Sequence, residues 1–336
     1  MYAVDWATRK EYKFCNVQTG KIKTLPNQIE TWQKWLKTLK PSHFYLEEGG
    51  GDSFKLLAKK LGHRVFTIPG IWVKRQREAF GLEKDDKIDA IVLSKVMKLQ
   101  PELFREFIED DILTAKVRLA YGSLENTERT MVQEKNRLIA LEKRLELFSL
   151  DGFERELVER QQDVVKSFQK KFEGDTKLLK QLVHQCPEWK EIFQPIKGCG
   201  ERVASGLIGY IGRPDRFPDN YHLRSYSGMK KKKGDQNFCH PLKRTLYFFA
   251  GGVIRAKNEK WYPLYLDIKK YYSEKHPDWR KGKVDNHARK FIETKFLDEV
   301  YEKMKGLEDG DIDFLPQATM GVPISSPENT GEGREC

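Results

Sequence analysis

The stretch "KDDKIDAIVLSKV" (residues 84–96) places Asp85, Asp86 and Asp89 at the start of an apolar segment with helical periodicity. Acidic side chains suit the beginning of a helix, where the helix dipole favours negative charge. One interpretation of these aspartates is therefore purely structural. In the other, Asp86 and Asp89 lie three residues apart on one helix face and bind a cation together through their carboxylate oxygens.

Two more carboxylates belong to predicted strands. Asp5 lies inside "YAVDWA" (residues 2–7), and Glu47 lies near the end of "HFYLEE" (residues 43–48), just before three glycines. A buried strand tolerates an ionised carboxylate only where its charge is compensated. Carboxylates from two strands and a helix thus predict a site for Mg²⁺ at one sheet edge, which is typical of phosphodiester chemistry. The alternative is that each acid is solvated or caps a helix.

The first hundred residues alternate between strand-like and helix-like segments. Such alternation predicts an α/β domain, in which helices pack on a mixed sheet. The expected strands cover residues 2–7, 11–17, 43–48 and 64–69, and the expected helices cover residues 27–39 and 53–61.

Long helices are predicted from about residue 101. Apolar residues recur every seven positions, while Thr127 and Glu134 interrupt the pattern. Such a repeat indicates either a coiled-coil arm for dimerisation or a long helix packed on its own domain. The repeat consists of Val117, Leu124, Met131, Leu138 and Leu145, with Leu141 and Phe148 at intermediate positions.

The composition favours a nucleic-acid partner. The 61 Lys and Arg residues outnumber the 50 Asp and Glu residues, which gives a net charge of +11. A basic surplus of this size fits a polyanion. The five cysteines are scattered without a CxxC pair, so neither a zinc ribbon nor a disulfide framework is expected. No signal peptide or apolar run of transmembrane length is evident, and we expect a soluble cytoplasmic protein with no membrane contact.

Candidate nucleic-acid-binding residues follow in the second half of the chain. In "IKGCGERVASGLIGYIG" (residues 196–212), a helix-hairpin-helix-like turn leads into a helix and offers backbone N–H groups to a phosphate. A basic run with interleaved aromatic residues covers residues 224–257 and suits nucleic acid, or else is a solvated surface beside a core helix. The candidates are Lys197, Gly198, Gly200, Arg224, Lys230, Lys231, Lys232, Lys233, Lys243 and Arg244.

The order "AVDWA … YLEEGGG … KDDKIDAIVLSK" resembles the DEDD transposases of the IS110 insertion-sequence family, which includes the Piv-type DNA invertases. The family signature is a strand Asp, then E-x-x-G, then K-x-D-x-x-D-A. "RPDRF" and "YHLRSYSGM" are similar to the family's C-terminal transposase domain. The residues that match the signature are Asp5, Glu47, Gly50, Lys84, Asp86, Asp89 and Ala90.

The resemblance implies an RNase H-like (RuvC-like) domain at residues 1–100, a long helical insertion at 101–186 and a mainly helical transposase domain at 187–306, before a tail at 307–336. It implies a DNA transposase or site-specific recombinase that uses Mg²⁺ on double-stranded DNA, in a bacterial or archaeal cytoplasm and associated with the nucleoid. It also implies target choice by a structured guide RNA and a working homodimer or tetramer. The implied metal ligands are Asp5, Glu47, Asp86 and Asp89.

The family's nucleophile is a serine in an S-G pair beyond the "aGl" segment, but Lys233 and Gly234 stand at that place here. Ser227 and Ser225 are the nearest hydroxyls, although both precede the expected position, and Ser227 is the candidate taken from the sequence. The departure leaves two other functions open. One is a metal-dependent, structure-specific DNA nuclease that uses water as nucleophile, and the other is a non-catalytic nucleic-acid-binding protein derived from a transposase.

Overall fold

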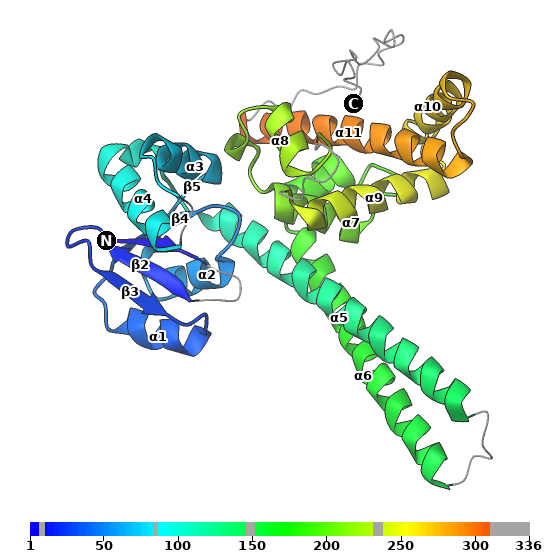
Figure 1. Cartoon of the computed structure of the whole chain (residues 1–336), viewed down its shortest axis with the longest axis horizontal. Coiled ribbons are helices and arrows are strands. Elements are labelled where there is room, and N and C mark those ends of the chain that lie inside the picture. Colours follow the sequence, from blue (N-terminus) through cyan, green and yellow to red (C-terminus); the bar gives the residue numbers. More distant parts are fainter. Residues whose placement is uncertain (7–10, 84–85, 146–151, 231–237, 310–336) are drawn as a thin grey trace, which may run out of the picture.

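The computed structural model describes residues 1–6, 11–83, 86–145, 152–230 and 238–309 (Figure 1). Its strands form one six-stranded sheet in the order β3-β2-β1-β4-β5-β6. Strands β1, β4 and β5 run parallel, whereas β2, β3 and β6 are antiparallel to their neighbours. This mixed sheet confirms the predicted fold class. The strands are β1 (Tyr2–Asp5), β2 (Tyr12–Asn16), β3 (Ile22–Leu25), β4 (His43–Glu47), β5 (Arg64–Ile68) and β6 (Arg105–Glu106).

Helices cover both faces of the sheet, because alternate side chains of each strand point to opposite faces. Val4 and Leu46 belong to the core beneath α1 and α2, whereas Ala3 and Tyr45 belong to the core beneath α3 and α4. The helices of this domain are α1 (Ile29–Lys37), α2 (Asp52–Lys60), α3 (Gly70–Ala79) and α4 (Asp86–Leu99).

Two long helices, α5 (Glu109–Leu145) and α6 (Gly152–Val183), lie side by side as an arm that projects from the body (Figure 1). The two polar residues that interrupt the seven-residue repeat are buried between them. Thr127 donates a hydrogen bond to Asp175 at 2.7 Å, and the Glu134 carboxylate accepts one from Gln161 at 2.9 Å. Polar pairs of this kind fix the register of two helices at some expense in stability.

The C-terminal body is helical. Val117 of α5 belongs to the core of this body, whereas Ala115 of the same helix belongs to the core of the sheet domain. The helix α5 therefore contributes side chains to both cores. No helix within the described ranges is long and apolar enough to cross a membrane. The helices of this body are α7 (Glu201–Ile211), α8 (Asn220–Tyr226), α9 (His240–Arg255), α10 (Trp261–Lys275) and α11 (Lys281–Asp309).

A buried ionic cluster joins the sheet domain to the C-terminal body. Arg118 of α5 donates two hydrogen bonds to the Asp52 carboxylate of α2, at 2.6 and 2.9 Å, and a third to the carbonyl oxygen of Gly209 in α7 at 3.0 Å. The ammonium group of Lys55 lies 3.8 Å from the same carboxylate. Burial lowers the pKa of Lys55 to about 8, and the charge of Asp52 only partly offsets this effect.

The low pKa of Lys55 predicts a pH-dependent difference between the protein and its Lys55→Met variant. The folded state releases the Lys55 proton near pH 8, whereas the unfolded chain keeps it until about pH 10.5. Between these values the unfolded state binds more protons, so the wild type gains about 1 kcal/mol per pH unit relative to Lys55→Met. Urea unfolding of both proteins from about pH 7 to about pH 10 measures this gain. A constant difference over that range would show that Lys55 stays protonated in the folded state.

Candidate active site

The parallel pairing of β1 and β4 brings Asp5 and Glu47 to the same edge of the sheet. Val4 pairs with Leu46, so Asp5 and Glu47 are the next residues in register at the carboxyl ends of neighbouring strands. By alternation both lie on the sheet face covered by α3 and α4. The sequence prediction that these two acids converge agrees with this placement.

Two glycines allow the loops at this edge to approach closely. A Cβ atom on Gly70, the first residue of α3, would lie 2.0 Å from a carboxylate oxygen of Glu47. A Cβ atom on Gly50 would lie 2.1 Å from the indole ring of Trp6. The glycine of the E-x-x-G motif therefore makes room for the ring that follows Asp5.

The helix α4 begins at Asp86 and packs against β1, β2 and β4. Asp89, one turn into the helix, is mostly buried and accepts a hydrogen bond from the Arg77 guanidinium of α3 at 2.6 Å. Within the described part of the chain, no three His, Cys, Asp or Glu side chains are grouped closely enough to hold a metal ion. The Asp86 side chain is outside that part, as is Asp85.

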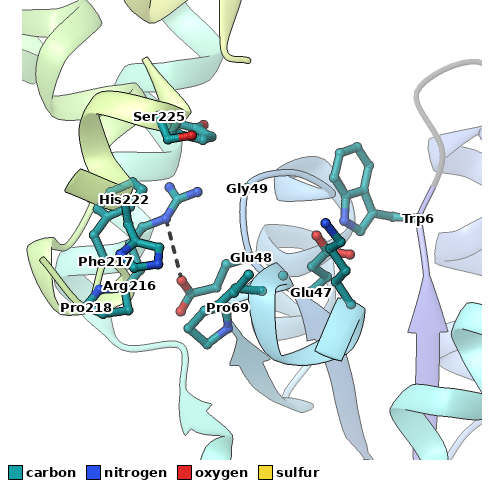
Figure 2. Close-up of a pocket in the computed structure, with 14 residues that line it drawn as sticks. Trp6, Glu47, Glu48, Gly49, Pro69, Arg216, Phe217, Pro218, His222 and Ser225 are labelled. Atoms are coloured by element: carbon teal, nitrogen blue, oxygen red, sulfur yellow. Dashed lines mark ion pairs between the residues drawn. The ribbon is translucent and has the colours of Figure 1, made fainter. Parts of the chain in front are cut away.

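A cavity of about 530 Å³ lies between these strand ends and the C-terminal body (Figure 2). One wall comes from Trp6 after β1 and from the loops after β4 and β5, and the other comes from α8 and the segment before it. Arg216 faces Glu48 across the cavity, with the guanidinium 3.9 Å from the carboxylate. The labelled lining residues are Trp6, Glu47, Glu48, Gly49, Pro69, Arg216, Phe217, Pro218, His222 and Ser225.

Glu47 and Glu48 have different surroundings, although both line the cavity. The Glu48 carboxylate accepts a hydrogen bond from Thr67 at 3.3 Å and lies 3.2 Å from the guanidinium of Arg105. Glu48 is thus held by the fold and by cations on both sides. The choice of Glu47 over Glu48 as the equivalent of the family's glutamate stays a prediction from the sequence.

The helix α8 presents one hydroxyl to the cavity and buries the other. Ser227 is fully buried, and its hydroxyl donates to the carbonyl oxygen of Arg224 at 3.0 Å. Ser227 therefore caps the end of α8 and has no access to the cavity. Ser225, two residues earlier, is half-buried and lines the cavity opposite Glu47 (Figure 2).

A histidine of α8 and the aspartate that caps the start of this helix accompany Ser225. The ring nitrogen Nδ1 of His222 lies 2.7 Å from the Asp219 carboxylate, which also accepts the backbone N–H of His222 at 2.9 Å. These contacts hold the pKa of Asp219 below its ordinary value. Residues three apart share a helix face, so the spacing of Asp219, His222 and Ser225 is a signal in the sequence from which this cluster could have been found.

Gly198 of the predicted phosphate-binding turn has a packing role. Gly198 has a φ of +96°, and a Cβ atom there would lie 2.7 Å from the carbonyl oxygen of Gly252 in α9. The carbonyl oxygen of Lys197 accepts a hydrogen bond from Asn258 at 3.0 Å. Gly200 directly precedes α7, as the sequence predicted, so the N–H groups at the start of α7 follow a tightly packed turn.

The predicted basic residues fall into two groups. Arg224 forms an ion pair with Asp298, and Arg244 lies 3.3 Å from Glu125 and 3.7 Å from Glu128, so both guanidinium groups have acidic partners within the protein. Lys230 and Lys243 are exposed on the surface, each over an aromatic ring. Lys231, Lys232 and Lys233 lie outside the described residues.

Two family models match the chain, and both describe the same family. The model described as "Transposase" for the DEDD domain of IS110 matches residues 7–145, and the model described as "Transposase IS116/IS110/IS902 family" matches residues 190–266. The chain belongs to the IS110 family of transposases. No curated protein matches it.

The two family matches divide at the arm. The first covers α5 and the sheet domain from residue 7 onward, so β1 precedes the matched segment, and the second covers the cavity wall formed by α8 together with α7 and α9. The family assignment makes the chain a DNA transposase or recombinase with an N-terminal DEDD domain and a C-terminal transposase domain. The cavity described above lies where these two domains of the IS110 transposase meet.

Proposed function

We propose that this transposase cuts and rejoins double-stranded DNA at the cavity between its two domains. The single observation that carries the proposal is the position of Glu47, which adjoins Asp5 in strand register and lines the same cavity as Ser225. Acidic side chains thus lie on one wall and a hydroxyl on the other. This arrangement suits transfer of a phosphodiester from DNA to the protein.

The residues that would hold Mg²⁺ are Asp5, Glu47, Asp86 and Asp89. Their oxygen donors are of the type that Mg²⁺ prefers. When bound, the metal lowers the pKa of an attacking hydroxyl and stabilises the charge on the leaving oxygen. The Asp89 carboxylate accepts a hydrogen bond from the Arg77 guanidinium in this structure. Asp89 would therefore have to release Arg77 in order to bind Mg²⁺.

Ser225 is the hydroxyl we propose as nucleophile, in place of the buried Ser227. Its oxygen would form a bond to phosphorus while the bond from phosphorus to the sugar oxygen breaks. We propose that His222 takes the proton of Ser225 and returns it to the leaving sugar oxygen. Asp219 orients the ring of His222 through Nδ1, as a carboxylate does in other hydroxyl-activating sites.

We further propose that a structured RNA from the same mobile element selects the DNA target. The support is the family assignment together with the net charge of +11, which suits a protein that binds more than one polyanion.

A reconstituted reaction tests the function and the nucleophile together. Purified protein, its flanking element DNA, the associated transcript and Mg²⁺ are expected to yield recombined DNA and a covalent protein–DNA adduct on denaturing gels. Ser225→Ala and Asp5→Asn should each remove the adduct, because one lacks the nucleophile and the other a metal ligand. His222→Asn should slow adduct formation by about 100-fold and flatten its pH dependence. The control Ser167→Ala, on the arm, should react like the wild type.

Each alternative predicts a different result in the same reaction. Cleavage without an adduct would indicate a nuclease that uses water. Binding without any product would indicate a non-catalytic protein. An adduct that survives Ser225→Ala but not Ser227→Ala would return the nucleophile to Ser227. Recombination that does not depend on the transcript would refute RNA guidance.

The Arg77–Asp89 pair predicts how stability depends on metal. In Arg77→Gln the mostly buried Asp89 loses its cation, which should cost about 3 kcal/mol in the presence of EDTA. Mg²⁺ should restore much of this loss, so the melting temperature of Arg77→Gln should rise more with Mg²⁺ than that of the wild type. The control Arg75→Gln changes an exposed cation on the same helix, away from the cavity lining, and should behave like the wild type. An equal Mg²⁺ response in all three proteins would argue against Asp89 as a ligand.

We propose that the arm joins two copies of the chain. Both of its helices expose apolar side chains seven residues apart, namely Val132 and Ile139 on α5 and Leu157 and Val164 on α6. Such stripes suit a bundle of four helices from two arms.

Ile139→Lys should therefore convert a dimer into a monomer in sedimentation experiments while the helix content stays the same. The control Gln133→Lys places the same charge on an exposed polar position of α5 that lies off the face of Val132 and Ile139, and it should leave the dimer intact. A monomeric wild type would refute the arm as a dimer contact.

A further inference from the structure

A basic and aromatic surface surrounds the connection between α10 and α11. We call residues 269–290 the hairpin tip. The tip follows the segment matched by the second family model, which ends at residue 266. It contains eight Lys or Arg residues against three acids. In Figure 1 this connection lies at the opposite end of α11 from α8.

Several rings at the hairpin tip are stacked and partly exposed. Trp279 lies parallel to His276, with ring centroids 4.0 Å apart and an interplanar angle of 5°. Tyr272 is nearly parallel to Trp279 at 6.0 Å, and His287 lies 4.6 Å from Trp279. All four of these rings are only half-buried. The rings thus form a small aromatic platform at the surface.

Unpaired cations surround this platform. The Nζ atom of Lys283 lies 3.8 Å from the ring centroid of Trp279. Asp285 pairs with Lys269 and Arg289, so those two cations are neutralised within the tip. By contrast, Arg280, Lys281 and Lys283 are exposed and have no carboxylate partner among the residues that the structure describes. The free positive charge is therefore concentrated beside the rings.

We propose that the hairpin tip binds unpaired nucleotides, with the three free cations on the phosphates and the aromatic platform against a base. Cations neutralise phosphates and release counterions, while aromatic faces stack on bases of any sequence. A base in an intact duplex is already stacked on its neighbours and does not offer its face. An acidic peptide would satisfy the cations but would leave the parallel rings without a function.

This surface is separate from the catalytic cavity. Asp298, which pairs with Arg224 of α8, lies thirteen residues after Asp285 on the same helix. At the rise of an α-helix this separation corresponds to roughly 20 Å. The inference shares with the proposed function only a nucleic-acid partner, and it concerns binding and not strand transfer.

Fluorescence anisotropy with the full-length protein in EDTA tests the proposal without DNA cleavage. The probes are a labelled single strand of about 12 nucleotides, as DNA and as RNA, and the corresponding DNA duplex. The triple variant Arg280→Gln, Lys281→Gln, Lys283→Gln should bind both single strands more weakly. A plot of log binding constant against log salt concentration should be less steep by about 2 for this variant than for the wild type. The matched control Lys34→Gln, Lys37→Gln, Lys40→Gln removes the same charge from exposed lysines of the sheet domain and should bind like the wild type.

Trp279→Leu separates the base contact from the charge. It should weaken single-strand binding about tenfold and leave the salt slope unchanged, because stacking carries no counterion release. A thermal melt of each variant shows whether the protein remains folded.

Equal binding by the folded triple variant and its control would overturn the proposal. If the triple variant lost as much affinity for the duplex as for the single strands, the assignment to unpaired nucleotides would be overturned. Asp5→Asn should bind single strands like the wild type, so a failure of the catalytic proposal is distinguishable from a failure here.

Discussion

The guanidinium of Arg118 connects the sheet domain, the arm and the C-terminal body. It donates to Asp52 of α2 and to the carbonyl oxygen of Gly209 in α7. A Cβ atom on Gly209 would lie 3.1 Å from the Cα atom of Arg118, so a glycine there lets α7 approach α5 closely. Replacing a buried ion pair with apolar residues often costs nothing, whereas removing one partner costs about 3–5 kcal/mol. The pair therefore specifies how the two bodies are oriented more than it stabilises either of them.

The orientation of the two bodies places the adjacent residues Glu47 and Glu48 in different surroundings. Consecutive residues at the end of a strand project in opposite directions, and Glu48 is directed to Arg105 and Arg216 while Glu47 contacts the start of α3. The Arg216–Glu48 pair is mostly screened from water, since both side chains are close to one-tenth exposed. Its attraction is therefore less weakened by salt than that of a surface pair. The buried Arg216–Glu48 ion pair therefore lies at the edge of the cavity between the two domains.

Sequence patterns predicted the elements that bury a regular apolar face and missed those that do not. The edge strand β3 is almost wholly exposed, and β6 has only two residues, so neither carries an alternating apolar signal. Asp5 and Glu47 were predicted to converge because both belong to predicted strands, but the sequence placed Asp5 inside its strand, whereas β1 ends at Asp5. The pairing of Asp89 with Arg77 was not, since it depends on how α3 packs against α4. Ser227 was taken from the sequence as one of the hydroxyls nearest to the expected place of the family's serine, but its accessibility depends on how α8 packs on its neighbours.

The position of α8 in turn depends on α11. A helix of seven residues is too short to be stable alone. The ion pair between Arg224 and Asp298 and the hydrogen bond from Asn220 to Glu302, at 2.8 Å, attach α8 to α11. The helix α11 is one helix of 29 residues that begins within the hairpin tip, so the tip and the helix that carries Ser225 are attached to the same element. The chain thus has a continuous covalent and ionic connection between the hairpin tip and the hydroxyl in the cavity.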